Sequence, residues 1–165
     1  MKILIIEDVL SHMQDMHNYL VQQGHNVSPT EADHLKLKEE ISRCFQKGVE
    51  TAIAKEANDF IRKYIEEFNP DIVLVDYELK EGSKGVNGRR FIETFLPNKK
   101  IIIVTGQRKP EVNNELSDLV EKAPKLRSIC WKHDLMEDDF FDRLLSTINK
   151  FNPPPSGDPS VTFAQ

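Results

Sequence analysis

Short runs of apolar residues recur along the sequence. They are Ile3 to Ile6, Ile72 to Val75, Ile101 to Val104 and the weaker Ile129 to Trp131. Runs of this length are typical of strands that are buried on both faces of a parallel sheet. Apolar residues at helical spacing lie between and after the runs, for example Val9, Met13, Met16 and Leu20, and later Phe140, Phe141, Leu144, Leu145 and Ile148. These stretches predict helices that cover the sheet.

Strands that alternate with helices are typical of an α/β protein. Parallel strands need crossover connections, and right-handed crossovers place helices on both faces of the sheet. We therefore predict a doubly wound, five-stranded parallel sheet sandwiched by helices. In such sheets, ligands bind at the carboxyl ends of the strands.

The segment from residue 24 to residue 68 is longer than one strand and one helix require, and two registers compete for it. In the first, residues 25–29 form the second strand, and a helical pattern runs from Leu37 to Tyr64. Such a helix would be about 42 Å long. It would have to protrude beyond the sheet or break at Gly48, because that length exceeds a typical strand more than twofold.

In the second register, the strand consists of the alternating residues Val49, Thr51 and Ile53. A covering helix then spans residues 57–68, and an inserted helix spans residues 31–46. We favour this register, which places an extra helical segment at about residues 25–47, between the first and third strands. The excess helical length leaves open a homodimer through this segment or through the last helices.

The last residues differ in composition from the rest of the chain. Residues 151–165 contain four prolines, Pro153, Pro154, Pro155 and Pro159. Such a segment cannot form a helix or a central strand and has little to bury, so we predict a disordered tail. Residues 1–150 are predicted to form one domain, and the absence of a second globular segment predicts a stand-alone domain without an attached output domain.

Charge and cysteine content narrow the function classes. The formal net charge is −5 and the isoelectric point is about 5.6, which argues against direct binding to nucleic acid. The two cysteines, Cys44 and Cys130, do not suggest a disulfide framework. The first apolar run ends at Glu7, too early for a signal peptide or a membrane span. We therefore expect a cytoplasmic protein that does not bind membranes.

Polar residues follow the predicted strands at their carboxyl ends. Glu7 and Asp8 follow the first apolar run, and Asp76 follows the second. Thr105 follows the third run, and Lys132 follows Trp131 at the end of the fourth. Because parallel strands end at the same edge of the sheet, all five side chains are expected to converge there. The five histidines show no such spacing, and solvent-exposed or capping roles are expected for His12, His17, His25, His34 and His133.

Three carboxylates at one sheet edge repel one another, so the cluster of Glu7, Asp8 and Asp76 predicts a site for a hard cation such as Mg²⁺. With a cation present, Asp76 can act as a nucleophile on phosphorus. Lys132 and the Thr105 hydroxyl would then supply a positive charge and a hydrogen bond to the equatorial oxygens of the phosphoryl group.

This order of residues resembles the receiver domain of bacterial response regulators, a CheY-like fold. That family has an acidic pair after strand one, an aspartate after strand three, a hydroxyl after strand four and a lysine after strand five. The glycine turn Gly85-Val86-Asn87-Gly88 also resembles the turn before the family's third helix. The resemblance covers roughly residues 1–150, apart from the extra segment, and implies that Asp76 is the phospho-acceptor.

The resemblance also implies roles for individual residues. Asp8, Asp76 and the backbone carbonyl of Glu78 would bind the metal directly, and Glu7 would act mainly through water. Gly106 matches a position where the family prefers a small residue. Gln107 and Glu78 would line the path of the hydrolytic water.

Three features depart from the family pattern. His133 follows Lys132, where the family usually has proline. Ile129 occupies the position of the aromatic residue that commonly rotates on activation. The loop from Tyr77 to Asn87 is a few residues longer than is typical.

The resemblance implies a signalling module, not an enzyme, although it catalyses its own phosphorylation and dephosphorylation. Its partners would be a histidine kinase or phosphotransfer protein and a downstream protein target. One alternative is a haloacid-dehalogenase-type phosphatase, but that family has a second aspartate where Glu78 lies. A second alternative is an adaptor of the same fold that works without phosphorylation, which intact Asp76, Thr105 and Lys132 disfavour.

Overall fold

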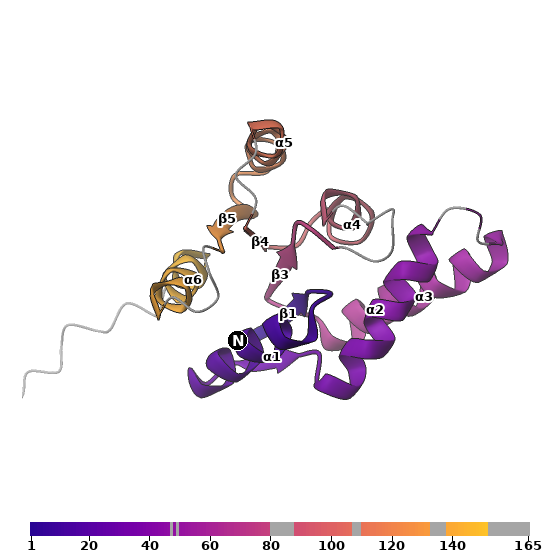
Figure 1. Ribbon diagram of the computed structural model, residues 1–165, viewed down its shortest axis with the longest axis horizontal. Helices are drawn as coiled ribbons and strands as arrows, with labels where there is room; N and C mark the ends of the chain where they lie inside the picture. Colours follow the sequence, from indigo (N-terminus) through magenta and orange to yellow (C-terminus); the bar gives the residue numbers. More distant parts are fainter. Residues whose placement is uncertain (47, 49, 80–87, 107–109, 133–137, 152–165) are drawn as a thin grey trace, which may run out of the picture.

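The computed structural model describes residues 1–46, 48, 50–79, 88–106, 110–132 and 138–151. Its centre is one sheet of five parallel strands in the order β2-β1-β3-β4-β5 (Figure 1). The strands are β1 (Lys2–Ile6), β2 (Asn26–Ser28), β3 (Ile72–Asp76), β4 (Ile101–Thr105) and β5 (Arg127–Trp131). The predicted fold class is confirmed, because four of the five strands contain the four apolar runs.

Helices cover both faces of the sheet. The helices are α1 (Leu10–Gln22), α2 (Glu31–Phe45), α3 (Thr51–Phe68), α4 (Gly88–Phe95), α5 (Pro110–Glu121) and α6 (Asp138–Phe151). The chain places α1 and α6 on one face and α2, α3, α4 and α5 on the other, as the two apolar clusters show. The strands are buried on both faces, since Ile3 and Ile5 point into one cluster and Leu4 and Ile6 into the other.

The favoured register for the second strand is wrong. The second strand is Asn26–Ser28, which pairs with β1 through Lys2↔Asn26 and Ile3↔Val27. Thr51 and Ile53 lie in α3, and Val49 lies outside the described residues. The alternation of Val49, Thr51 and Ile53 is a shorter pattern than the helical spacing of Ala57, Ile61 and Ile65. The last three residues are buried by α3 against the sheet.

The long helical pattern breaks at Gly48, as the first register allowed. Gly48 has a φ of 83°, a left-handed conformation that glycine adopts without the steric cost of a side chain. The inserted helix is present as α2, whose first turn is capped by the Thr30 hydroxyl, which accepts a hydrogen bond from the Asp33 N–H. The extra helical segment therefore begins after β2, at Glu31, and not at residue 25.

The two helices α2 and α3 pack side by side as a hairpin that extends beyond the sheet (Figure 1). The hairpin is tied to neighbouring elements at both ends. Near the sheet, the hydroxyls of Tyr64 and Ser28 are 2.7 Å apart. Near the turn, the Phe45 ring packs against Phe95 of α4 and under the guanidinium of Arg90.

Two further predictions concern membrane-spanning helices and the C-terminal tail. No helix among the described residues is long and apolar enough to cross a membrane. The predicted disordered tail lies outside the described residues, except for Phe151 at the end of α6.

Candidate functional site

The carboxyl ends of the strands bring the predicted site residues together. Asp76 is the last residue of β3 and Thr105 the last of β4. Glu7 and Asp8 directly follow β1, and Lys132 directly follows β5. The register sets these positions, because Ile6 pairs with Val75, Asp76 with Val104 and Thr105 with Trp131.

The three predicted carboxylates form one cluster. Glu7, Asp8 and Asp76 each offer an oxygen, and these oxygens lie within 4.8 Å of one another. Glu7 and Asp76 are buried, and Asp8 is partly exposed. Carboxylate oxygens are the ligands that Mg²⁺ prefers, so this donor set fits a magnesium ion with access from solvent on the Asp8 side.

Lys132 neutralises part of this negative charge. Its Nζ lies 2.7 Å from Oε2 of Glu7 and 3.0 Å from Oδ2 of Asp76, with only 10% of the lysine side chain exposed. Burial alone would lower the pKa of Lys132, but the charges of Glu7 and Asp76 outweigh burial and raise it. The ammonium is therefore held in its charged form between two carboxylates.

Burial changes the acidity of Glu7. Burial and the neighbouring charge of Asp76 raise the pKa of Glu7 to about 8, although Lys132 opposes the shift. Nδ1 of His12 lies 3.7 Å from Oε1 of Glu7, but burial and the charge of Lys132 lower the pKa of His12. Lys132 thus offsets only part of the negative charge of the carboxylate cluster. A divalent cation would offset the remainder.

The Asp76 carboxylate is fixed by two different groups. The backbone N–H of Glu78 donates to Oδ1 at 3.0 Å, and the Lys132 ammonium donates to Oδ2. Hydrogen bonds to both oxygens restrict rotation of the side chain and hold it in one orientation. The predicted contact of the Glu78 carbonyl with a metal ion stays a prediction.

Thr105 and Lys132 are connected through the backbone. The Thr105 side chain is fully buried, and its carbonyl accepts a hydrogen bond of 2.8 Å from the backbone N–H of Lys132. Gly106 follows, and a Cβ at this position would lie 3.4 Å from the Lys132 carbonyl oxygen. A Cβ at position 106 would thus be in ordinary van der Waals contact with Lys132, so the preference for a small residue there stays a prediction.

Gly88 is required by its contact with Asp76. A Cβ at Gly88 would lie only 2.4 Å from the Asp76 carbonyl oxygen, closer than any side chain can approach. The Gly88 N–H also donates to the carbonyl of Tyr77 at 2.9 Å. The other residues of the predicted glycine turn, 85–87, lie outside the described residues.

Sequence reasoning missed the contribution of α2. His34 is buried rather than solvent-exposed or capping, and its Nε2 donates to the backbone carbonyl of Glu7 at 2.6 Å. It shares one helix face with Leu37 and Ile41 at spacings of three and seven residues, and this spacing could have indicated its burial.

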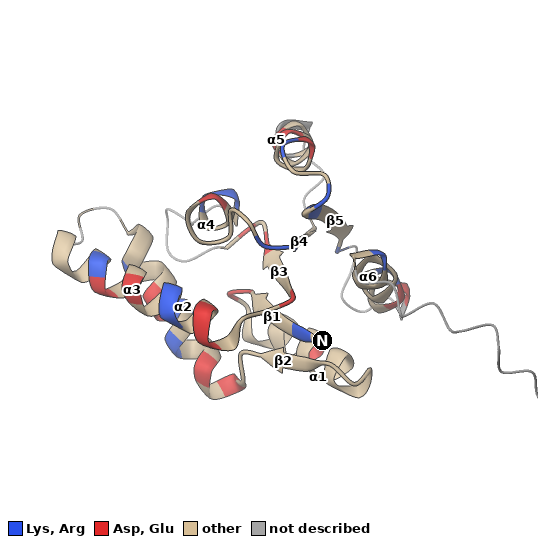
Figure 2. Cartoon of the chain, turned by 180° about the vertical axis from the view of Figure 1, so that it is seen from behind, with Lys and Arg blue, Asp and Glu red and all other residues tan. Residues whose placement is uncertain are grey.

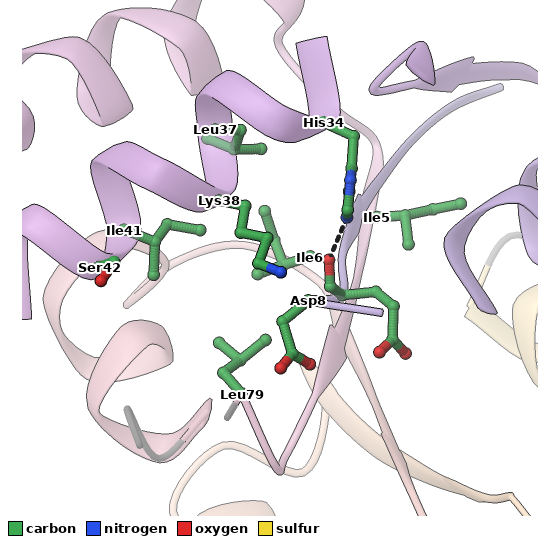
Figure 3. Close-up of a pocket in the computed structure, with 10 residues that line it drawn as sticks. Ile5, Ile6, Asp8, His34, Leu37, Lys38, Ile41, Ser42 and Leu79 are labelled. Carbon is green, nitrogen blue, oxygen red and sulfur yellow. Dashed lines mark hydrogen bonds between the residues drawn. The ribbon is translucent and has the colours of Figure 1, made fainter. Parts of the chain in front are cut away.

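A small hollow lies between α2, the end of β1 and Leu79, as Figure 3 shows. Its volume is about 20 Å³, roughly the space of one water molecule. Lys38 extends from α2 toward Asp8 on the wall of this hollow. The inserted helix thus adds polar and apolar side chains to the edge of the acidic cluster.

The structure describes only some of the residues that depart from the family pattern. Ile129 lies in β5, opposite Ile103, and packs partly buried against the apolar cluster beside Trp131. His133 and Gln107 lie outside the described residues.

Acidic and basic residues are interspersed along α2 and α3, as Figure 2 shows.

The arrangement of strands matches that of a solved protein. The chain is similar to the Vibrio cholerae chemotaxis protein CheY4, with a TM-score of 0.53 and 15% identity over 91% of this chain and 97% of that chain. It has a CheY-like receiver fold.

A DNA-binding response regulator of the LuxR family from Staphylococcus aureus is also similar, with a TM-score of 0.49 and 21% identity over 92% of this chain and 98% of that chain. Neither the protein-family models nor the curated proteins include a match to the sequence. The receiver fold therefore rests on the likeness to CheY4 and on the topology of the sheet.

Proposed function

We propose that the chain is a response regulator whose Asp76 accepts a phosphoryl group from a histidine kinase or a phosphotransfer protein, with Mg²⁺ as cofactor. The observation that carries the proposal is the setting of Asp76, whose two carboxylate oxygens are held by the Glu78 N–H and the Lys132 ammonium. Two further carboxylates, Glu7 and Asp8, each offer an oxygen, and these oxygens and one of Asp76 lie within 4.8 Å of one another.

Phosphoryl transfer would proceed by direct displacement. An oxygen of Asp76 attacks phosphorus, the bond from phosphorus to the donor nitrogen breaks, and the leaving imidazole keeps the electron pair and takes up a proton. The product is an acyl phosphate. Lys132 stabilises the negative charge on the transferred group, and Thr105 is the second candidate for contact with its oxygens.

Mg²⁺ would be held by Asp8 and Asp76, with the Glu78 carbonyl as a further ligand and Glu7 acting through water. When bound, the ion supplies positive charge that offsets the repulsion between the carboxylates and the incoming phosphoryl group. The chain would be a signalling module that self-catalyses phosphorylation and dephosphorylation, and not an enzyme that turns over a separate substrate. It would act in the cytoplasm.

The phosphorylated form would bind a downstream protein. The family resemblance points to the last two helices and the adjoining strand edge, which here are α5, β5 and α6. Leu116, Ile129 and Trp131 line a shallow depression between α5 and β5 on this side. Phosphorylation would change the binding of the partner there.

The test is phosphorylation by a small donor. The purified protein is incubated with Mg²⁺ and acetyl phosphate, and intact mass is measured for wild type, Asp76→Asn and Asp59→Asn. Asp59 is exposed on α3, so its substitution makes the same charge change away from the site. We expect one acid-stable, base-labile phosphoryl adduct in wild type and Asp59→Asn and none in Asp76→Asn.

Two other results would contradict the proposal in different ways. If no adduct forms and Mg²⁺ has no effect on the backbone amide spectrum, the adaptor alternative is favoured. If the protein hydrolyses a phosphomonoester with multiple turnovers that Asp76→Asn abolishes, the phosphatase alternative is favoured.

A further inference from the structure

The inserted helix brings a second lysine to the acidic cluster. Lys38 lines the same hollow as Glu7 and Asp8, and Figure 3 shows it extending from α2 toward the end of β1, where Asp8 lies. Lys132 comes from β5 and pairs with Glu7 and Asp76. Lys132 therefore pairs with two of the carboxylates, and Lys38 extends toward the third, Asp8.

The position of Lys38 is set by a well-anchored helix. On α2, His34, Leu37 and Ile41 are buried, and His34 binds the carbonyl of the residue before Asp8. The Thr30 cap fixes the start of the same helix. Lys38 is the neighbour of Leu37 in sequence and lies at the edge of the buried face, so its stem begins at a fixed point beside the strand end.

The charge of Lys38 has a definite effect on a bound cation. A divalent ion at the carboxylates is repelled by each ammonium nearby, and an ammonium that approaches Asp8 also competes for its oxygens. Lys38 is only partly exposed, so solvent screens this repulsion less than at a fully exposed position. In the proposed function Lys132 also stabilises the charge of the transferred phosphoryl group. Lys38 has no such role, because it lies on the Asp8 side of the cluster.

We propose that Lys38 is a positioning residue that weakens Mg²⁺ binding at the acidic cluster, so that the inserted helix sets the magnesium concentration at which the site fills. The proposal rests on the metal site of the proposed function. Lys38 acts through Asp8 and does not take part in the transfer of the phosphoryl group.

The test compares Mg²⁺ affinity in wild type, Lys38→Gln, Lys38→Arg and Lys36→Gln. Lys36 is the matched control, because it lies on the same helix but is exposed and places its Nζ 4.7 Å from the centre of the Phe60 ring. Binding is followed by calorimetry and by the fluorescence of Trp131, the one tryptophan of the chain, which precedes Lys132. Neither measurement depends on phosphorylation.

We expect Lys38→Gln to lower the Mg²⁺ dissociation constant about fivefold, an effect of the size that one screened charge produces. Lys38→Arg and Lys36→Gln should remain within about twofold of wild type, since the first keeps the charge and the second is remote. The difference between Lys38→Gln and wild type should shrink as salt rises.

Other outcomes separate this proposal from the proposed function. If wild type binds Mg²⁺ and Lys38→Gln binds it equally or more weakly, the role of Lys38 is overturned and the receiver function stands. If Lys36→Gln tightens binding as much as Lys38→Gln, the effect is one of net charge and the proposal also fails. If no variant binds Mg²⁺, the metal site itself is absent and the proposed function fails with it.

Discussion

Nε2 of His34 lies 2.6 Å from the backbone carbonyl oxygen of Glu7, so the inserted helix is attached directly to the strand end that carries the acidic pair. A carbonyl oxygen only accepts, so the ring nitrogen is the donor. Nδ1 of the same ring is buried and has no hydrogen-bond partner among the described residues. His34 is therefore a buried structural contact between α2 and β1.

Replacement of His34 should destabilise the protein. We expect His34→Ala to lower the free energy of unfolding by about 2–3 kcal/mol, because it leaves a buried carbonyl unpaired and removes a packed ring. Chemical denaturation measures the change. The neighbouring Leu35→Ala is the control, since Leu35 is 59% exposed and should alter stability little. Equal losses in both variants would contradict the role of His34.

The close approach of Gly88 to Asp76 gives a second prediction. Gly88→Ala would place a methyl group 2.4 Å from the Asp76 carbonyl oxygen, and the backbone of β3 or α4 would have to move. We expect a loss of about 2–3 kcal/mol in the free energy of unfolding and slower phosphorylation by acetyl phosphate. Gly106→Ala, whose new methyl would lie 3.4 Å from the nearest atom, should cost less. A larger loss in Gly106→Ala would refute this reading.

The sheet and its polar edge were predictable because they depend on short-range patterns. Uninterrupted apolar runs identify strands buried on both faces, and Asp76 and Thr105 end two of those runs. Parallel topology then brings the ends together without further information. The same argument placed Lys132 beside Asp76, where the structure has it.

The region between β1 and β3 was harder to predict because its signals conflict. The strand Asn26–Ser28 has only three residues, too few for a clear period, and the alternation around Ile53 imitates a strand. The contact of His34 with Glu7 depends on how α2 packs over the sheet, which no local pattern specifies. The approach of Lys38 to Asp8 depends on the same packing.

Lys132 occupies a buried ion pair, and its loss should be costly. Lys132→Ala leaves the buried Asp76 carboxylate without its ammonium partner, so we expect the metal-free protein to lose about 3–5 kcal/mol. Added Mg²⁺ should restore part of this stability. Lys122→Ala removes an exposed pair with Asp118 and should leave stability nearly unchanged. Thermal unfolding with and without Mg²⁺ tests both statements, and no difference between the two variants would contradict them.

His25 should make stability depend on pH in a region away from the carboxylates. It lies between α1 and β2, and its Nε2 is buried with no hydrogen-bond partner among the described residues. Burial and the charge of the N-terminal ammonium lower the pKa of His25 below its ordinary value of 6.5. At a pH between the lowered pKa of the folded state and 6.5, the unfolded chain therefore binds more proton at His25 than the folded chain does.

The folded state consequently loses stability through His25 as the pH falls through 6.5 toward the lowered pKa of the folded state. In His25→Gln the residue stays neutral, so this loss should be absent, and the melting temperature of the variant should rise relative to wild type as the solution is acidified. If the melting temperatures of His25→Gln and wild type differ by a constant amount across this range, His25 does not titrate as argued.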